Sequence, residues 1–238
     1  MMPNKPGKLF LVPSPIDQNN NQQFLINWQL NKIHHIRHFF VENEKVARSI
    51  LKHIKLDVPI QQVKLFKNDS STSIDEIHEI FTSELNGEDI GLLSDSGTPC
   101  IADPGAKIVD YAHKNNINVE PLIGPSSIIM ALMSSGFNGQ RFRFLGYVPI
   151  NKEEKRNFFK EIEKTIQLTN ETQIFIETPY RNDQLLSDLI ETLNDELRIC
   201  VASNITAKDE QIISMEIARW KHLERPSLNK KPCIFLVN

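Results

Sequence analysis

The residues best suited to bind a ligand lie in the stretch 93–105, which reads LSDSGTPCIADPG. This stretch directly follows the apolar, strand-like run Ile90 to Leu93. Gly97 and Gly105 allow backbone angles and close approaches that other residues resist, and the small polar side chains around them leave main-chain amides accessible. Because ligands of open α/β sheets bind where a strand is followed by a helix, the stretch predicts a ligand site.

Asp103 and Pro104 predict how this loop ends. Aspartate is a favoured N-cap and proline is favoured at the first helical position, so a helix is expected to begin at Pro104. An alternative interpretation is an ordinary tight connection between a strand and a helix, in which Asp95 and Asp103 only cap backbone amides. Composition alone leaves both interpretations open.

Two further loops carry polar residues directly after apolar runs. The sequence Gly124-Pro125-Ser126-Ser127 follows the run 118–123 and precedes an apolar helical segment. Serine hydroxyls and free amides at a helix N-terminus suit a carboxylate or a ribose, although Ser126 is equally suited to a simple N-cap role. The segment 177–181 reads ETPYR, and its Arg181 either faces a ligand or pairs with a surface acid.

The chain lacks the patterns of several common site types. It contains no GxxxxGK[ST], no GxGxxG and no Gly-x-Ser-x-Gly elbow, so neither a P-loop, a standard dinucleotide fingerprint nor a serine hydrolase is expected. His34, His35 and His38 cluster on a predicted strand, where His34 and His38 would share one face. No acidic or cysteine partner at a suitable spacing accompanies them, so no metal site is expected.

Composition limits the partners and the compartment. The 238 residues carry a net charge of −3, which excludes a protein that coats nucleic acid over its whole surface. The three cysteines are widely spaced, which is typical of a reducing compartment and excludes a disulfide framework. Residues 1–8 contain no apolar signal-peptide core, and no apolar run has the length of a membrane span. We therefore expect a cytoplasmic protein without a membrane segment.

A local contact with nucleic acid is compatible with this charge. Five basic residues between 141 and 156 are interleaved with Phe142, Phe144 and Tyr147. Cationic and aromatic side chains together are typical of a surface for single-stranded RNA. The same pattern also fits a strand whose phenylalanines enter the core beneath a charged rim.

The elements that must position these loops alternate along the chain. Strands are expected at 9–12, 35–41, 62–66, 90–94, 118–123, 143–145, 173–176, 198–202 and 233–237, and helices at 44–54, 74–85, 107–114, 127–134, 153–166 and 183–193. Strands that alternate with helices indicate an α/β fold. The Gly124-Pro125 pair and the turn-rich stretch 136–140 predict two α/β domains, 1–123 and 124–238.

Taken together, four segments resemble the tetrapyrrole methylase superfamily of S-adenosylmethionine-dependent methyltransferases. They are the loop 93–105, the segment PLIGPSS at 121–127, the segment RFRFLGYVP at 141–149 and ETPYR at 177–181, in the order and spacing of the family. The nearest branch is the ribosomal RNA small subunit methyltransferase I type. Its loop typically reads SD-AGTP-xISDPG, where the porphyrin and corrin methylases carry a GDP-type loop.

The resemblance implies two α/β domains joined near Gly124, S-adenosylmethionine in the cleft between them, and a homodimer. It also implies which residues contact the cofactor, namely Ser94, Asp95, Ser96, Gly97, Thr98, Ile101, Ala102, Asp103, Ser126 and Ser127. The substrate side of the cleft is implied to be lined by Pro13, Ser14, Pro15 and Ile16 and by Tyr180 and Arg181.

Departures from the family concentrate on the substrate side. The family's TPIGN is here SPIDQ at 14–18, its EDTR is ENEK at 42–45, its RELTK is SNITA at 203–207, and its closing GE is Lys231-Pro232. The first acid of the second motif, Glu42, is retained. The cofactor loops are therefore better preserved than the elements that would meet the acceptor.

The function implied is methylation of small-subunit ribosomal RNA on a cytidine 2'-hydroxyl. Such an acceptor needs alignment and help in losing its proton, and Glu42 and Asp103 are the candidate catalytic residues. Ribosomal RNA or the ribosomal subunit is then the partner. Two alternatives are C-methylation of a porphyrin or corrin precursor and a non-catalytic relative that only binds the cofactor.

Overall fold

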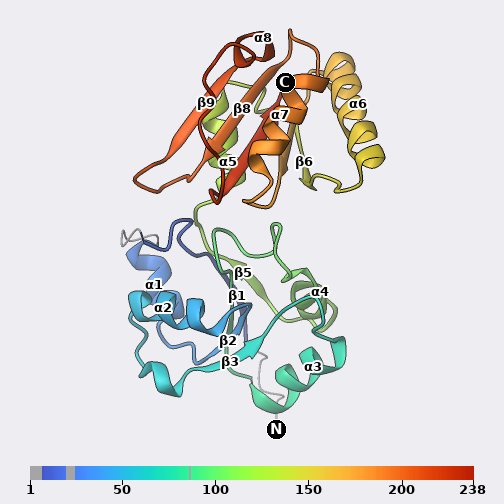
Figure 1. Cartoon of the computed structure of the whole chain (residues 1–238). Helices are drawn as coiled ribbons and strands as arrows, with labels where there is room; N and C mark the ends of the chain where they lie inside the picture. The colour runs from blue at the N-terminus through green and yellow to red at the C-terminus, as the bar shows by residue number, and fades with distance from the viewer. Residues whose placement is uncertain (1–6, 20–24, 86) are drawn as a thin grey trace. The chain divides into compact units, whose positions relative to one another are not determined.

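The computed structural model describes residues 7–19, 25–85 and 87–238, so parts of the segment 1–8 lie outside it. The chain separates into two compact units, 1–125 and 126–238, each built on its own sheet (Figure 1). We describe each unit by itself. Among the described residues, no helix combines the length and the apolar character needed to cross a bilayer.

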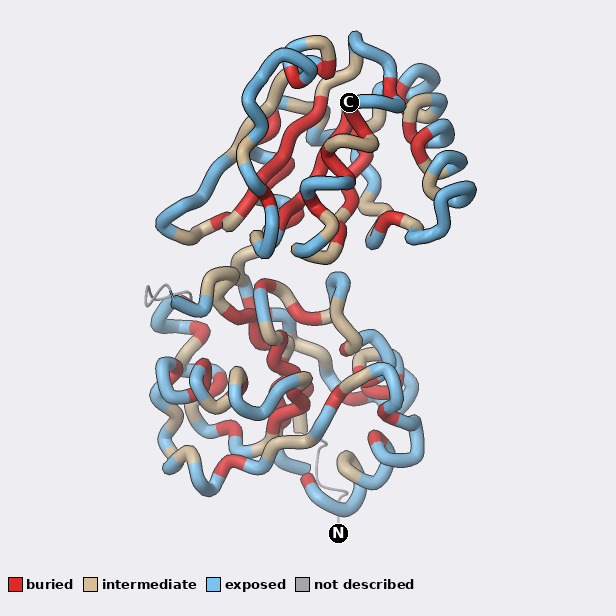
Figure 2. Tube along the Cα trace, viewed as in Figure 1, coloured by how far each residue is buried: buried red, intermediate tan, exposed pale blue. Residues whose placement is uncertain are grey.

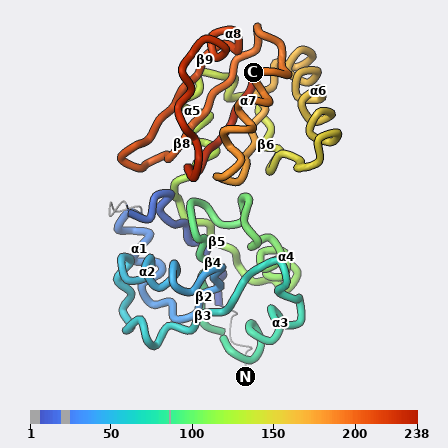
Figure 3. Tube along the Cα trace, in the orientation of Figure 1, coloured from blue at the N-terminus to red at the C-terminus, as the bar shows by residue number. Residues whose placement is uncertain are grey.

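The first unit contains a parallel sheet of five strands in the order β3-β2-β4-β1-β5. Its strands are β1 (Leu9–Val12), β2 (His38–Val41), β3 (Lys64–Lys67), β4 (Ile90–Leu93) and β5 (Val119–Pro121). Figure 3 shows β1, drawn in blue, beside β4 and β5, which come much later in the sequence. Parallel strands bring their carboxyl ends to one edge, so the loops after β1, β2 and β4 are neighbours.

Helices cover both faces of this sheet. The helical elements are α1 (Asn27–Ile33), α2 (Glu44–Ile54), η1 (Ile60–Gln62), α3 (Ile74–Glu79), the π-turn η2 (Ile80–Glu84) and α4 (Ala106–Lys114). Phe10, Phe39 and Leu93 pack with α1 and α2 on one face, while Leu9 and Ile90 pack with α3 and α4 on the other. Successive strand residues point to opposite faces, so apolar runs such as 90–93 are buried on both sides (Figure 2).

The second unit has a mixed sheet in the order β6-β7-β10-β8-β9. Its elements are α5 (Ser127–Ser135), β6 (Phe142–Tyr147), α6 (Lys152–Thr169), β7 (Thr172–Ile176), α7 (Asn182–Thr192), β8 (Arg198–Ser203), β9 (Gln211–Glu216), α8 (Ile217–Trp220) and β10 (Cys233–Val237). Only β6 and β7 are parallel neighbours. One face packs Phe175, Phe235 and Val201 against α6, α7 and α8, and α5 contacts β8, β9 and β10. The expected α/β fold is confirmed.

The structure corrects two expectations about element boundaries. No helix begins at Pro104, because residues 101–105 form bends and a turn, and α4 starts at Ala106 with Gly105 as its N-cap. His34 does not share a strand face with His38, because His34 is the C-cap of α1 and β2 begins only at His38. The helix α1 and the edge strand β9 were not expected from the sequence.

Candidate active site

The loop after β4 is joined to the loop after β1 by backbone hydrogen bonds. The Ser14 amide donates to the Gly97 carbonyl at 2.8 Å, and the Gly97 amide donates to the Ser14 carbonyl at 3.2 Å. The buried Ser14 hydroxyl donates to the Ser94 carbonyl at 2.5 Å. Ser14 therefore holds the loop 94–98 in place, which ties the predicted substrate-side segment 13–16 to the predicted cofactor loop.

Gly97 is needed for the shape of this loop. Its φ of +72° lies in the left-handed region, and an added Cβ would meet the Pro125 carbonyl oxygen at 3.4 Å. Gly124 is tighter still, because an added Cβ would lie 2.2 Å from the Pro13 Cβ. The segments after β1, β4 and β5 thus converge through glycines that permit close approach.

The turn at residues 100–102 is backbone-strained. Cys100 has a φ of +68° and Ala102 a φ of +57°, although both carry a Cβ. Between them the Ile101 side chain is 53% exposed. Non-glycine residues in this region cost on the order of 1–3 kcal/mol each and concentrate at ligand sites. Burial raises the pKa of the Cys100 thiol to about 11, so this cysteine is no nucleophile at neutral pH.

The Asp103 side chain holds the two ends of the segment 100–105 together. Its Oδ1 atom accepts hydrogen bonds from the Cys100 amide at 3.2 Å and from the Gly105 amide at 3.1 Å. Its Oδ2 atom is buried and has no hydrogen-bond partner among the described residues. One oxygen of the Asp103 carboxyl group therefore shapes the loop, and the other accepts no hydrogen bond from the loop.

The Glu42 carboxyl group lies beside the Asp103 carboxyl group. Glu42 follows β2, the neighbour of β4, and the Asp95 amide points to its Oε1 at 3.5 Å. Burial and then the Asp103 carboxyl raise the pKa of Glu42 to about 7. Two carboxyl groups this close cannot both be charged at low cost, so the raised pKa keeps Glu42 protonated below this pH.

Asp95 adds a third carboxyl group to the same loop. Its Oδ1 accepts a hydrogen bond from the Asn43 amide at 3.3 Å, and burial raises its pKa. Asn43 is in turn the N-cap of α2, accepting from the amides of Lys45 and Val46. Sequence reasoning treated Asn43 only as a departure from the family motif, although an asparagine directly before a helical segment is itself an N-cap signal.

The two serines of the second loop begin the second unit. Ser126 is the N-cap of α5, and its hydroxyl accepts from the Ile129 amide at 3.5 Å. Ser127 is the first helical residue. Ser126 therefore acts as an N-cap, and the first amides of α5 are those a helix leaves free for an acceptor.

The third loop is braced by an ion pair within itself. Arg181 pairs with Glu177, whose side chain is only 6% exposed, and its Nε donates to the Thr178 hydroxyl at 3.2 Å. Arg181 is therefore paired with a buried acid of its own loop and not with a surface acid. Between them Tyr180 is 75% exposed. The loop presents an exposed aromatic ring from a turn that this ion pair holds together.

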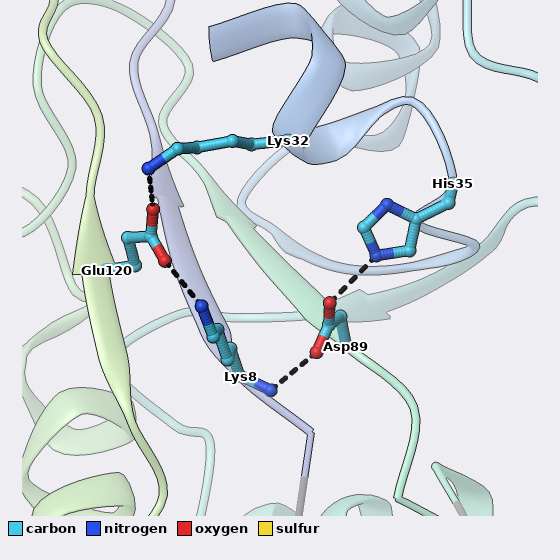
Figure 4. Close-up of polar contacts among 5 residues, drawn as sticks. All are labelled: Lys8, Lys32, His35, Asp89 and Glu120. Atoms are coloured by element: carbon cyan, nitrogen blue, oxygen red, sulfur yellow. Dashed lines mark hydrogen bonds and ion pairs between the residues drawn. The ribbon is translucent and has the colours of Figure 1, made fainter. Parts of the chain in front are cut away.

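A different polar cluster lies at the amino end of the first sheet (Figure 4). Glu120 on β5 pairs with both Lys8 and Lys32, the former at 3.0 Å. Asp89 accepts from the Lys8 amide at 2.7 Å and contacts His35 Nε2 at 2.8 Å. Acid and base groups satisfy one another here. In the described part of the chain, no group of three or more His, Cys, Asp or Glu residues is arranged to hold a metal ion.

Comparisons with known proteins agree with this architecture. The family model described as Tetrapyrrole (Corrin/Porphyrin) Methylases matches residues 30–220. The chain is 30% identical to "Ribosomal RNA small subunit methyltransferase I" of Buchnera aphidicola subsp. Schizaphis graminum, over 99% of this chain and 79% of that protein. It is 32% identical to the protein of the same name from Bacillus subtilis, over 90% of this chain and 70% of that protein.

Solved structures share the fold at low identity. The methyltransferase CobJ superposes with a TM-score of 0.63 at 14% identity, covering 98% of this chain and 94% of that one. The cobalt precorrin-4 methyltransferase CbiF superposes with a TM-score of 0.61 at 11% identity, covering 97% and 94%. The chain belongs to the tetrapyrrole methylase family, and it is an S-adenosylmethionine-dependent methyltransferase.

Proposed function

We propose that this protein methylates a ribose 2'-hydroxyl of a cytidine in small-subunit ribosomal RNA. Relatives that align with nearly the whole chain carry the name ribosomal RNA small subunit methyltransferase I. The observation that carries the proposal in this molecule is the pair formed by Glu42 and Asp103, because an alcohol acceptor must lose a proton whereas a carbon nucleophile of a tetrapyrrole is already electron-rich.

Glu42 is proposed as the general base. A base works best when its pKa is near the working pH, and the pKa of Glu42 is raised to about 7. Its carboxylate accepts the proton of the 2'-hydroxyl as the oxygen attacks. Bound S-adenosylmethionine supplies an electrophilic methyl group for in-line displacement. The alignment of the acceptor supplies much of the remaining rate enhancement.

Asp103 is proposed to act with Glu42. The Cys100 and Gly105 amides hold its Oδ1, so the unpartnered Oδ2 keeps a constant direction. A fixed carboxylate beside Glu42 keeps the pKa of Glu42 high. A second role is to stabilise positive charge near the loop, because a sulfonium is favoured beside carboxylates.

The cofactor contacts are proposed for residues Ser94–Thr98, Ile101–Asp103, Ser126 and Ser127. The loop fits such a ligand in two respects: the strained turn exposes Ile101, and the Asp95 and Asp103 carboxyl groups belong to the same loop. Apolar and carboxylate groups together suit a ligand that is both aromatic and cationic. The segment 13–16, Tyr180 and Arg181 are proposed to meet the acceptor.

The decisive experiment uses labelled S-adenosylmethionine with small ribosomal subunits that lack the modification, and with tetrapyrrole precursors in parallel. We expect label in the ribosomal RNA at a cytidine whose 3' phosphodiester resists alkaline cleavage, because a 2'-O-methyl group blocks that reaction. Label in a tetrapyrrole would instead establish C-methylation. Cofactor binding without transfer to either acceptor would indicate a non-catalytic relative.

We further propose that the protein is a cytoplasmic homodimer that recognises the ribosomal subunit. The family resemblance supports the dimer, and a ribosomal RNA substrate places the reaction where ribosomes are assembled. Sedimentation equilibrium at micromolar concentration is expected to give twice the mass of one chain. A monomer that remains active would contradict the dimer without affecting the proposed reaction.

A further inference from the structure

The outer face of α2 carries a row of cations beside the carboxyl pair. Ala47, Ile50, Leu51 and Ile54 of this helix are buried against the sheet. Lys45, Arg48 and Lys52 lie at spacings of three and four residues on the opposite face, within an arc of about 60° at 100° per residue. We define these three residues as the α2 cation row.

The charged residues of α2 are mostly basic, whereas those of the helix α6 are nearly balanced. Its eleven residues include the three cations of the row and one acid, Glu44. The longer α6 instead carries five Lys or Arg and four Glu. The whole chain has 27 basic and 30 acidic residues, so an excess of cations on one helix is a local feature. A balanced surface is the ordinary outcome of solubility, whereas a one-sided row suits an anionic partner.

The row is largely available for such a partner. Lys45 and Lys52 are exposed, and in the part of the chain that the structure describes neither forms an ion pair. Arg48 is more fixed, because it donates to the Ile60 carbonyl at 3.2 Å and lies 3.8 Å from Glu44. An open hollow of about 500 Å³ over this face is lined, among described residues, by the row together with Glu44 and Ser49.

The row starts shortly after the proposed general base, Glu42. Glu42 directly follows β2, Asn43 caps α2, and Lys45 follows in the first turn. The Asn43 amide also donates to Asp95, so the start of α2 is tied to the loop after β4. From Lys45 to Lys52 the helix rises about 10 Å at 1.5 Å per residue, so the row is long enough to meet more than one phosphate of a strand.

We propose that the α2 cation row binds the sugar-phosphate backbone of the RNA that carries the acceptor. This inference rests on the proposed function. The carboxyl groups of Glu42, Asp95 and Asp103 repel phosphates, so an RNA that brings a ribose to them needs compensating cations close by. The row supplies them on the same segment that supplies Glu42. It contributes affinity and orientation and takes no part in proton transfer.

The test is the double variant Lys45→Ala/Lys52→Ala, with Lys160→Ala/Lys164→Ala as the matched control. The control also removes two exposed lysines from one helix, but from the balanced α6. Binding to a single-stranded RNA oligonucleotide is measured by fluorescence anisotropy at several salt concentrations. Each phosphate contact with a single strand contributes about 0.7 to the slope of log K against log salt. Loss of two contacts should therefore reduce that slope by about 1.4.

Methyl transfer to small ribosomal subunits completes the test. We expect the row variant to raise KM about tenfold, with kcat, cofactor affinity and melting temperature close to wild type, and the α6 control to change none of these. A row variant that retains the wild-type salt slope for RNA overturns the proposal. If the same variant loses binding to vesicles of anionic lipid, the row binds a membrane surface and not RNA. If wild type transfers no methyl group to subunits, the proposed reaction fails, and the salt slope still decides whether the row binds RNA.

Discussion

The two ends of the first sheet both collect charged side chains, but they arrange them differently. At the amino end, Glu120 lies between Lys8 and Lys32, and Asp89 lies beside His35. At the carboxyl end, Glu42, Asp95 and Asp103 gather without a described cation in ion-pair contact. Both sets occupy the same sheet in the same unit.

The electrostatic outcome follows from this arrangement. Lys32 and Lys8 hold the pKa of Glu120 below its usual range, so its charge is stabilised by the fold. Burial and Asp103 raise the pKa of Glu42 to about 7, so its charge is opposed by the fold. Opposite charges in a cluster stabilise one another. Like charges repel one another, so they stay together only because the rest of the fold holds them there. The second kind is the one to associate with chemistry.

The largest effect is expected from Gly97→Val, which should abolish cofactor binding measured by calorimetry. A β-branched residue is strained at a φ of +72°, and its side chain would fill the space toward the Pro125 carbonyl. Gly139→Val is the control, because an added Cβ there meets nothing within 4 Å. Wild-type affinity in a folded Gly97→Val protein would mean that the cofactor binds elsewhere.

Next in size is Glu42→Gln, expected to lower kcat about 100-fold or more while cofactor affinity changes little. A general base contributes typically about 10²–10⁴-fold to the rate. The matched change at the other end, Glu120→Gln, should leave kcat at the wild-type value. Steady-state kinetics with the ribosomal acceptor measures both. Equal losses of kcat in the two variants would contradict the assignment of catalysis to the carboxyl end of the sheet.

The dependence of activity on pH sharpens the assignment. Because Glu42 must be deprotonated to act, kcat/KM should rise as the pH increases through about 7 and then level off. Asp103→Asn removes a contact that raises the pKa of Glu42, so the rising limb should move to lower pH. A limb that stays in place in this variant would show that Glu42 does not titrate beside Asp103.

Stability should respond to pH in the corresponding direction. The pKa of Glu42 is raised above its value of 4.5 in the unfolded chain, so its contribution to stability is present below about pH 4.5 and is lost as the pH rises to about 7. Glutamine does not ionise, so Glu42→Gln removes this pH-dependent loss of stability. Its melting temperature relative to wild type should therefore be higher at pH 8 than at pH 4.5, as measured by scanning calorimetry.

The smallest effect is expected for the change in stability that Glu120→Gln causes. Its two lysine partners are each more than 40% exposed, and exposed ion pairs contribute about 0–1 kcal/mol. Urea denaturation at neutral pH should show a decrease in the free energy of unfolding within that range. A loss of several kcal/mol would mean that the amino-end cluster is essential for folding.

Much of this architecture follows from local sequence patterns. The alternation of apolar runs and helical spacing predicts the α/β class, and the bounds of α2 and β10 agree with the expected ranges 44–54 and 233–237. Asp103 shows where local reasoning stops. Aspartate before proline is a good N-cap signal, yet its Oδ1 closes the turn 100–105 and α4 starts later at Ala106.

The sequence by itself determined the class of the fold, the loops that follow the strands and, through its motifs, the family. Only the tertiary structure decided that Glu42 and Asp103 meet. These residues are 61 positions apart, and they come together because β2 pairs with β4 while β3 lies outside at the edge. Strand order depends on how the connecting helices pack across the sheet, and no short window of residues records it. The raised pKa of Glu42 is a property of that neighbourhood.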